Sequence, residues 1–268
     1  MEIRRAASHP HLRGVVRSYE GRRVELCRAT LTWAIAARPH QILNINLAEP
    51  FRVRIDCGEA NPAPDISVAG PLTDRRAYVS LSGSIHAFHI IFQPTGLNRL
   101  VGVNATSLVN QNPAASDVLG KSAAALGDAV RMTPDFDQRV AAVERWIGTM
   151  LERRDPDCPI GLASRRMIAA RGAARIEDLV AESGFSASQF ARRFEMRVGM
   201  APKLFARMIR FDRALIARRE AANRPWTDIV HELGYFDQAH FIRECHAFTG
   251  LPPSGLVGDW NNVFCPDG

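Results

Sequence analysis

The stretch WTDIVHELGYFDQAHFIRECHAFTGLPP, residues 226–253, decides how the C-terminal part of this chain folds. Apolar residues recur there with the spacing of one helix face, at Trp226, Ile229, Val230 and Leu233. Gly234 then marks a turn, and the sequence predicts a second helix from about Asp237 to Gly250. A helix, a glycine turn and a polar second helix are typical of a helix-turn-helix DNA-binding unit. The pattern alone is a weak signal because many packed helix pairs share it.

The composition is that of an ordinary globular protein with room for two domains. The chain has 268 residues, of which 46% are hydrophobic and 23% charged. It contains no apolar run approaching the roughly 18 residues of a membrane helix, and its start lacks the apolar stretch of a signal peptide. We therefore expect a cytoplasmic protein. Five scattered cysteines without a CxxC pair predict reduced thiols and argue against a disulfide framework or a zinc site.

Positive charge is concentrated towards the C-terminus. The whole chain carries a net charge of +6. Residues 160–258 hold 15 Lys and Arg against 10 Asp and Glu, an excess of 5 in little more than a third of the chain. Such a basic segment favours a polyanionic partner and supports nucleic-acid binding without establishing it.

The N-terminal residues 1–110 have the pattern of a β-rich domain. Period-two alternation with β-branched residues predicts strands over residues 24–36, 41–48, 51–57, 77–83 and 84–92. Proline and glycine separate these segments. Short antiparallel strands of this kind predict a small, cupin-like β sandwich or barrel with trailing helices. With the helical C-terminal part, the predicted fold class is α+β in two domains.

Two histidines in the last predicted strand are candidates for metal binding, and we interpret both as ordinary strand residues. His86 and His89 are three positions apart, so their side chains point to opposite faces of the strand. No nucleophile–base pair or carboxylate cluster stands out in this region. We expect no catalytic residue, no metal and no cofactor.

A helical segment with a linker is predicted over residues 111–160. FDQRVAAVERWIGTMLERR, residues 136–154, has one apolar face and predicts an amphipathic helix. This helix either packs on its own domain, which we favour, or pairs with a second subunit. DPDCPIG, residues 155–161, breaks the helix and is the expected domain linker.

A second copy of the helix-turn-helix pattern lies 50 residues upstream of the first. Residues 179–185 read LVAESGF where residues 229–235 read IVHELGY. Past the turn the offset becomes 51, which places Phe190 with Phe241, Arg192 with Arg243, Gly199 with Gly250 and Pro202 with Pro253. One extra residue therefore lies in the second turn. Unrelated helix pairs would not keep this register, so the chain is predicted to contain two homologous units.

One helix is predicted to join the two units. Residues 203–222, KLFARMIRFDRALIARREAA, carry an apolar stripe, and about 18 residues span ~27 Å. Two units held this far apart could enter successive major grooves, which recur every ~34 Å along one face of the duplex. The helix also carries arginines that could meet phosphate or simply face solvent: Arg207, Arg210, Arg213, Arg218 and Arg219.

The repeat and the amino-acid sequence of its second unit resemble the C-terminal DNA-binding domain of the AraC/XylS family of bacterial transcription regulators. The second unit of that family reads G-Y-x-D-Q-x-H-F-x-R-x-F-x-x-x-x-G-x-x-P. Matching positions here are Gly234, Tyr235, Asp237, Gln238, His240, Phe241, Arg243, Gly250 and Pro253. The resemblance covers about residues 160–257, within a predicted DNA-binding domain of residues 161–258. The β-rich region is similar only loosely to the upstream effector or dimerisation domains of the family.

The resemblance implies a sequence-specific transcription regulator that is not an enzyme. Its expected partners are double-stranded operator DNA and, further, RNA polymerase, with no membrane. The N-terminal domain would control it, with or without a small-molecule effector, and the protein would act as a monomer or a homodimer. Two departures from the pattern put local stability and one phosphate contact in doubt: Cys245 replaces a phenylalanine, and Leu256-Val257 replace an aromatic-arginine pair.

Carried over position by position, the resemblance assigns DNA-binding residues in both units. The first recognition helix would present Ser188, Gln189, Ala191 and Arg192 to base edges, and the second Gln238, Ala239, His240 and Arg243. Arginine can pair with guanine, glutamine with adenine, and alanine can touch a thymine methyl group. Asp237 is expected to cap its helix rather than read a base, and His240 could brace the turn instead.

Two other hypotheses remain open for the β-rich domain. It could be a cupin-like or alkyl-transfer enzyme fused to a DNA-targeting module, which would need clustered metal ligands or a reactive cysteine in a matching motif. Cys27 and Cys57 lie in no such motif. Alternatively, the domain could bind no small molecule and act through protein contacts alone.

Overall fold

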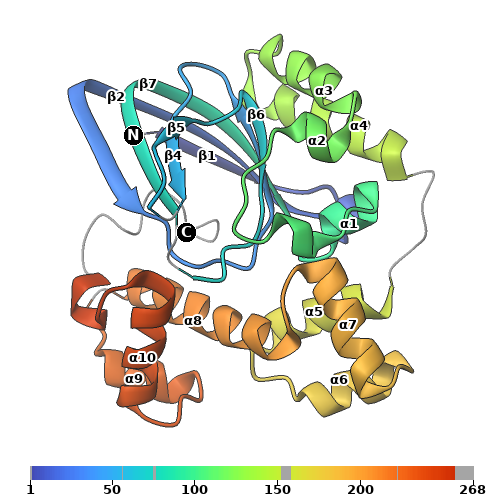
Figure 1. The fold of residues 1–268 in the computed structure, drawn as a ribbon, viewed down its shortest axis with the longest axis vertical. Helices are drawn as coiled ribbons and strands as arrows, with labels where there is room; N and C mark the ends of the chain where they lie inside the picture. The colour runs from blue at the N-terminus through green and yellow to red at the C-terminus, as the bar shows by residue number, and fades with distance from the viewer. Residues whose placement is uncertain (1, 56, 75–76, 152–157, 222, 257–268) are drawn as a thin grey trace.

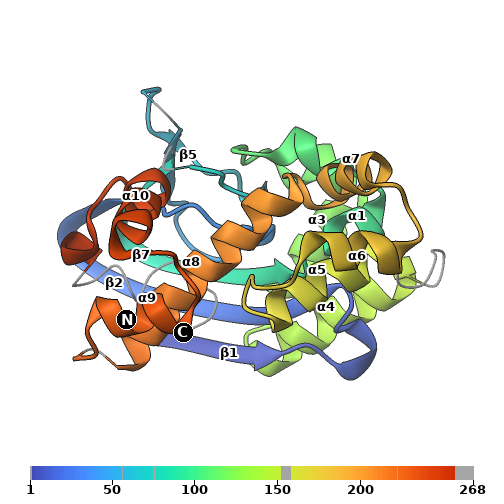
Figure 2. The ribbon, with the colours of Figure 1, turned by 90° about the horizontal axis from the view of Figure 1, so that it is seen from below.

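The computed structural model describes residues 2–55, 57–74, 77–151, 158–221 and 223–256. Figure 1 shows a β-rich part with covering helices above a wholly helical part. Figure 2, seen from below, shows the long helix α8 (Pro202–Glu220) running diagonally between the remaining helices of the lower part.

Seven strands form one bent antiparallel sheet. They are β1 (Glu2–Ala7), β2 (Val16–Ala34), β3 (Ile42–Asn46), β4 (Arg52–Ile55), β5 (Asn61–Pro62), β6 (Ile66–Ala69) and β7 (Ala77–Phe92). The order across the sheet is β1-β2-β7-β3-β6. Strands β3 and β4 lie end to end along the same edge of β7, because Ile45 pairs with Phe88 and Val53 with Val79. A bulge in β2 between Leu26 and Thr30 shifts its register against β7.

Helices cover one face of the sheet. They are η1 (Pro10–Leu12), α1 (Gly96–Val101), η2 (Ala105–Leu108), α2 (Ala115–Leu119), α3 (Ser122–Arg131) and α4 (Phe136–Leu151). Val143 and Ile147 of α4 are buried in the same core as Tyr19, Leu43 and Phe88 of the sheet. The amphipathic helix predicted over residues 136–154 therefore packs on its own sheet; residues 152–154 lie outside the described part.

The opposite face of the sheet carries a smaller apolar core and buried polar groups. Phe51, Leu72, Val79 and Leu81 belong to that core. His89 lies on this face, where its Nδ1 is 2.8 Å from Asn44 Oδ1. His86 points to the other face, where its Nε2 is 3.2 Å from Arg139 Nη1 on α4. The predicted opposite orientation of the two histidines is confirmed. The described residues contain no group of three or more His, Cys, Asp or Glu side chains suited to a metal.

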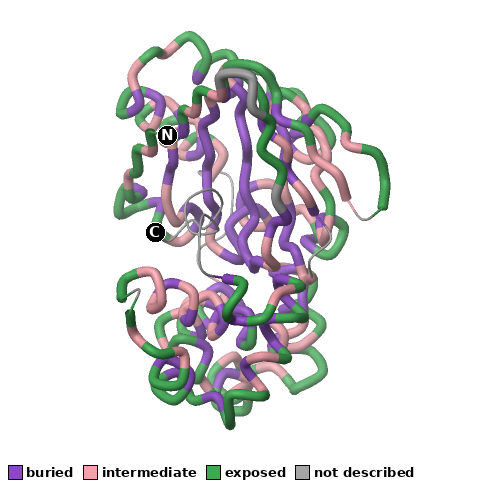
Figure 3. Tube along the Cα trace, turned by 90° about the vertical axis from the view of Figure 1, so that its left-hand side faces the viewer, coloured by how far each residue is buried: buried purple, intermediate pink, exposed green. Residues whose placement is uncertain are grey.

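The C-terminal part has its own core. Its helices are α5 (Pro159–Ala169), α6 (Ile176–Ser183), α7 (Ala187–Val198), α8, α9 (Trp226–Glu232), α10 (Gln238–Thr249) and η3 (Pro253–Leu256). Phe190, Phe194, Phe205, Phe211 and Phe241 are fully buried within it. Figure 3 shows buried residues along the strands and where the helices meet, with exposed residues along the outer surface of this part.

The two parts meet at the C-terminal ends of α7 and α10. Gly199, which ends α7 with a φ of 92°, lies against η2: a Cβ atom there would be 3.0 Å from Ala105 O and 3.1 Å from Pro71 Cγ. At the end of α10, the Ala37 N–H donates to Phe248 O at 2.8 Å. Both helices therefore point their C-terminal ends towards the β-rich part, and their N-terminal halves lie away from it (Figure 1).

The α+β fold class is confirmed, with differences in detail. The predicted strands 77–83 and 84–92 form the single strand β7, and β2 begins earlier than residue 24 because its first half pairs with β1. Strands β1, β5 and β6 were not predicted. The expected linker at residues 155–161 falls partly outside the described residues, and Pro159 already begins α5. None of the described helices is long and apolar enough to span a membrane. The predicted domain limits at residues 110 and 160 stay predictions.

Candidate nucleic-acid interface

The first recognition helix, α7, begins with a capping box. The Gln189 N–H donates to Ser186 Oγ at 3.3 Å, and the Ser186 N–H donates to Gln189 Oε1 at 3.1 Å. These two bonds satisfy amide groups that the first helical turn would leave without partners. They also hold the Gln189 side chain against its own helix, so one of the predicted base-reading groups is engaged within the protein.

The second recognition helix, α10, is capped differently. Asp237 accepts a hydrogen bond from the His240 N–H at 2.6 Å, which confirms the prediction that it is a capping residue. The His240 ring lies edge-on to Tyr235, with 5.4 Å between ring centres, and its Nε2 is 3.6 Å from Glu244 Oε1. His240 is thus half-buried and contacts its own unit, as the alternative interpretation expected.

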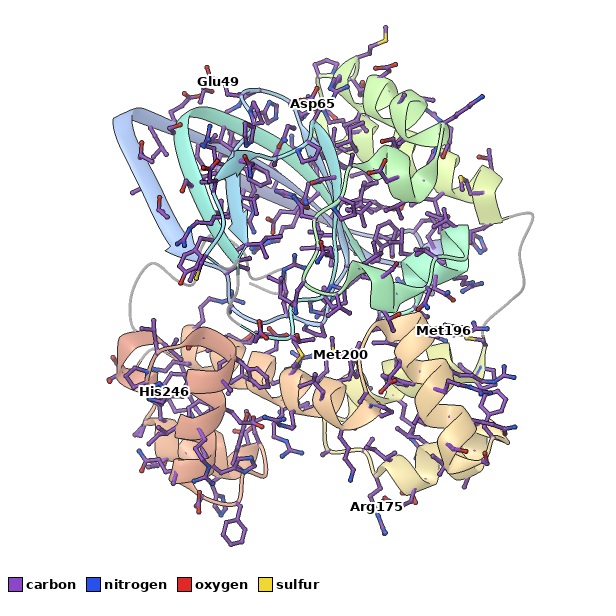
Figure 4. The ribbon with its side chains drawn as sticks, in the orientation of Figure 1. Glu49, Asp65, Arg175, Met196, Met200 and His246 are labelled. Carbon is purple, nitrogen blue, oxygen red and sulfur yellow. The ribbon has the colours of Figure 1, made fainter. Side chains whose placement is uncertain are left out.

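The candidate DNA-binding residues gather in two groups, one at each recognition helix. Ser188, Gln189 and Arg192 are exposed on α7, and Ala191 is half-buried. Of the candidates on α10, Gln238, Ala239 and Arg243 are exposed. Figure 4 marks Met196 and His246, later residues of the two helices, on either side of α8. The structure brings the members of each group together on one helix and separates the two groups by the length of α8.

Arg192 and Arg243 are the cations best placed for DNA. Both are exposed, and neither has a carboxylate within 4 Å among the described residues. Three arginines of α8, by contrast, have partners within the protein. Arg207 Nε donates to Glu244 Oε1 at 2.7 Å, Arg210 Nη2 to Gly172 O at 3.2 Å, and Arg218 Nη1 to Arg224 O. These contacts favour a structural role for the α8 arginines.

Glu244 holds the second unit together and was missed by sequence reasoning. Only 2% of it is exposed. Its carboxylate accepts the bond from Arg207 and a second one from Tyr235 Oη at 3.0 Å. Burial, and then the nearby Glu244 carboxylate, raise the pKa of Tyr235, so its hydroxyl stays protonated and donates. The available signal was position: Glu244 follows Phe241 by three residues, on the buried stripe of its helix.

Cys245 lies in the core of the second unit. Its departure from the family pattern was expected to fall on the packing side of the helix, and it does. It is fully buried, and burial raises the pKa of its thiol to about 12. Its counterpart in the first unit is Phe194, which contacts Phe190 and Phe205. Leu256 is also buried in this core, while Val257 lies outside the described residues.

Residues 164–257 match a family model described as a helix-turn-helix domain. The match spans both units and the helix between them. The C-terminal part of the chain is an AraC-type helix-turn-helix domain. The protein is accordingly a DNA-binding transcription regulator with a helix-turn-helix domain at residues 164–257.

Comparison with solved structures gives remote similarities only. ToxT from Vibrio cholerae O395 is 10% identical with a TM-score of 0.46, covering 89% of this chain and 97% of that one. A 1.65 Å resolution structure of ToxT is 10% identical with a TM-score of 0.48, covering 95% of this chain and 97% of that one. Unsaturated fatty acid bound ToxT from strain SCE256 is 12% identical with a TM-score of 0.47, covering 88% of this chain and 94% of that one. A likeness this remote says nothing further about this chain. No curated protein sequence matches it.

Proposed function

We propose that this regulator inserts α7 and α10 into two successive major grooves of its operator. The observation that carries the proposal is the exposure of both N-terminal halves on the side away from the β-rich part. Recognition helices contact bases through their N-terminal residues. The 19 residues of α8 span about 28 Å, close to the ~34 Å repeat of the grooves.

Within this arrangement the residues have different roles. Arg192 and Arg243 pair with guanine, Gln238 with adenine, and Ala239 touches a thymine methyl group. Ser188 lies beside Arg192 and contacts the same groove, while Ala191 is half-buried and lines its edge. Gln189 and His240 brace their own units, since the side chains of both are engaged there. All of these residues lie in the third of the three proposed domains, residues 161–258, which follows residues 1–110 and 111–160.

Loss of either arginine tests these roles. Arg192→Ala or Arg243→Ala should weaken binding to the operator by a factor corresponding to roughly 1–3 kcal/mol, and binding to random DNA far less. Gel shifts at fixed salt with both DNAs measure the difference. Equal losses on both DNAs would reassign the arginines to phosphate contacts.

The β-rich part has a small, partly open recess on the face of the sheet opposite the covering helices. Its free volume is about 40 Å³, so an effector would have to widen it on binding. Ile35, Phe51, Val53 and Leu72 give it apolar walls. An apolar pocket with a few placed polar groups is the usual form of a small-molecule site.

Arg38 indicates the charge of that effector. Its side chain lines the cavity and is only 9% exposed. Nη1 donates to His40 O at 2.5 Å, and no carboxylate lies within 4 Å among the described residues. Burial lowers the pKa of Arg38 to about 10, which still leaves it charged at neutral pH. A buried charge without a counter-charge is costly, so a ligand carboxylate would be stabilised there.

Arg38 also connects the cavity to the DNA-binding part. It follows Ala37, whose N–H bonds to the end of α10, and pairs with Leu72 through two backbone bonds of 2.8 and 2.9 Å. The neighbouring Pro71 contacts Gly199 at the end of α7. A ligand that holds Arg38 would therefore act next to both recognition helices, and this is how the N-terminal domain would control DNA binding.

A series of aliphatic monocarboxylates, each with its primary amide, tests the effector site on the full-length protein. The acids should raise the unfolding temperature of the wild type and change its operator affinity, and the uncharged amides should do neither. Arg38→Met should remove the response to the acids. Equal responses to acid and amide, or none to any acid of the series, would contradict an anionic effector at this cavity.

A further inference from the structure

The turn of the second unit contains one residue more than the turn of the first. In the first unit Gly184, with a φ of 70°, is followed by Phe185 and the capping residue Ser186. In the second, Gly234 has the same φ and is followed by Tyr235, Phe236 and the capping residue Asp237. Since Tyr235 corresponds to Phe185 and Asp237 to Ser186, the extra residue is Phe236.

Phe236 is the most exposed of the large apolar side chains in the described part of the chain, at 93%. A single exposed apolar residue is common and means little by itself. This one, however, contributes nothing to the core, although the turn that contains it is tightly held. The folding of this unit therefore does not require an apolar side chain at position 236.

Both neighbours of Phe236 are fixed in place. Tyr235 is buried, its N–H donates to Val230 O at 3.1 Å, and its hydroxyl donates to Glu244. Asp237 caps α10 through its bond to the His240 N–H. The backbone on either side of the phenyl ring is thus held in one conformation, so little entropy would be lost when the ring meets a partner.

The surroundings of Phe236 identify that partner as DNA. Gln238 and Ala239, the exposed first residues of α10, follow it directly. The major groove presents one apolar group on its base edges, the 5-methyl group of thymine, and phenylalanine is among the side chains that contact it. A phenyl ring at the start of a recognition helix lies where such a methyl group can be reached.

We propose that Phe236 is a specificity-determining residue that packs on the 5-methyl group of a thymine in the half of the operator bound by α10. The inference rests on the proposed function, in which α10 enters a major groove. It extends the base-reading surface from α10 into the preceding turn, and it gives the extra residue of the second unit a function that the first unit lacks.

The test begins with DNA selected by the full-length wild-type protein from random duplexes. If no sequence is enriched, the proposed function fails before Phe236 is measured. On the selected duplex, each thymine of the second half-site is replaced in turn by deoxyuridine, which removes only the methyl group. One replacement should weaken wild-type binding about fourfold, the loss expected for one methyl-sized apolar contact.

Phe236→Ala should weaken binding to the thymine duplex about tenfold, and it should make binding indifferent to that same replacement. Its unfolding temperature should equal that of the wild type, since the ring touches no core. Met132→Ala, which removes an 85% exposed side chain far from the DNA-binding part, is the matched control and should bind normally. A wild type indifferent to every replacement would overturn the proposal, as would a Phe236→Ala variant that remains equally sensitive or loses as much affinity for random DNA.

Discussion

The two helix-turn-helix units share one sequence pattern but are held together by different contacts. In the first unit, Arg193 lies over the ring of Phe185 at 4.5 Å and is exposed. At the corresponding positions of the second unit, the carboxylate of Glu244 is buried and accepts a bond from Tyr235. A surface cation on a ring has thus been exchanged for a buried hydrogen bond. Equivalent positions in a repeat need not perform equivalent tasks.

The third residue of each recognition helix, by contrast, makes contacts within its own unit in both copies. Gln189 and His240 correspond at the offset of 51, and each contacts its own turn. This agreement explains why two side chains that the family pattern would send to the bases remain within the protein. The difference between the units therefore lies in their cores and turns. The proposed recognition surface consists of the residues that remain: Ser188, Arg192, Gln238, Ala239 and Arg243.

Removing Glu244 should give the largest effect and sharpen the comparison most. Glu244→Ala leaves the buried Tyr235 hydroxyl without its acceptor, which should destabilise α9 and α10 by about 2 kcal/mol. Amide hydrogen exchange should then speed up roughly 30-fold in α10 and stay unchanged in α7.

Arg193→Ala is the matched control in the first unit. Because the side chain is exposed, its loss should change exchange in α7 by less than about twofold. If Arg193→Ala and Glu244→Ala had equal effects in their own units, the two cores would be held in the same way and the comparison would fail.

Substitution of the two glutamines should separate bracing from base recognition. Gln189→Ala removes half of the capping box, so it should cost about 1 kcal/mol in the stability of α7 and leave the base preference unchanged. Gln238→Ala should leave stability unchanged and lower operator affinity about tenfold. Unfolding curves and operator gel shifts on both variants measure these effects, and a changed base preference in Gln189→Ala would show that its side chain reads DNA.

The Cys245 thiol should give the smallest effect and report on the packing of the second unit. Because burial raises its pKa to about 12, almost no thiolate exists at pH 8, and the thiol should resist alkylation in the folded protein. The exposed Cys57 serves as an internal reference for the reagent. Mass spectrometry after brief alkylation should find Cys57 modified and Cys245 intact. Equal modification of both would mean that this core opens more readily than its contacts indicate.

Local patterns made much of this molecule predictable. The apolar spacing and the offsets of 50 and 51 were enough to place the paired helices. The capping box of Ser186 and Gln189 was not predicted, because Gln189 was assigned to base edges instead. Strands β1 and β6 were missed because β1 buries none of its side chains and β6 has only four residues, so neither shows a clear alternation.

Long-range contacts could not be foreseen in the same way. The position of Glu244 on its helix indicated burial, but its partner Arg207 lies 37 residues earlier on a different helix. The absence of a carboxylate within 4 Å of Arg38 among the described residues likewise depends on how distant segments meet around it. Both arise from tertiary packing between distant segments, and no local spacing of residues in the sequence indicates them.

Binding-site selection with the wild type, Arg192→Ala and Arg243→Ala tests the central claim most directly. If α7 and α10 read successive major grooves, the wild type should select two blocks of preferred bases about 10 base pairs apart. Each variant should then lose the preference in one block and keep it in the other. A single block, or loss of the same block in both variants, would contradict the account.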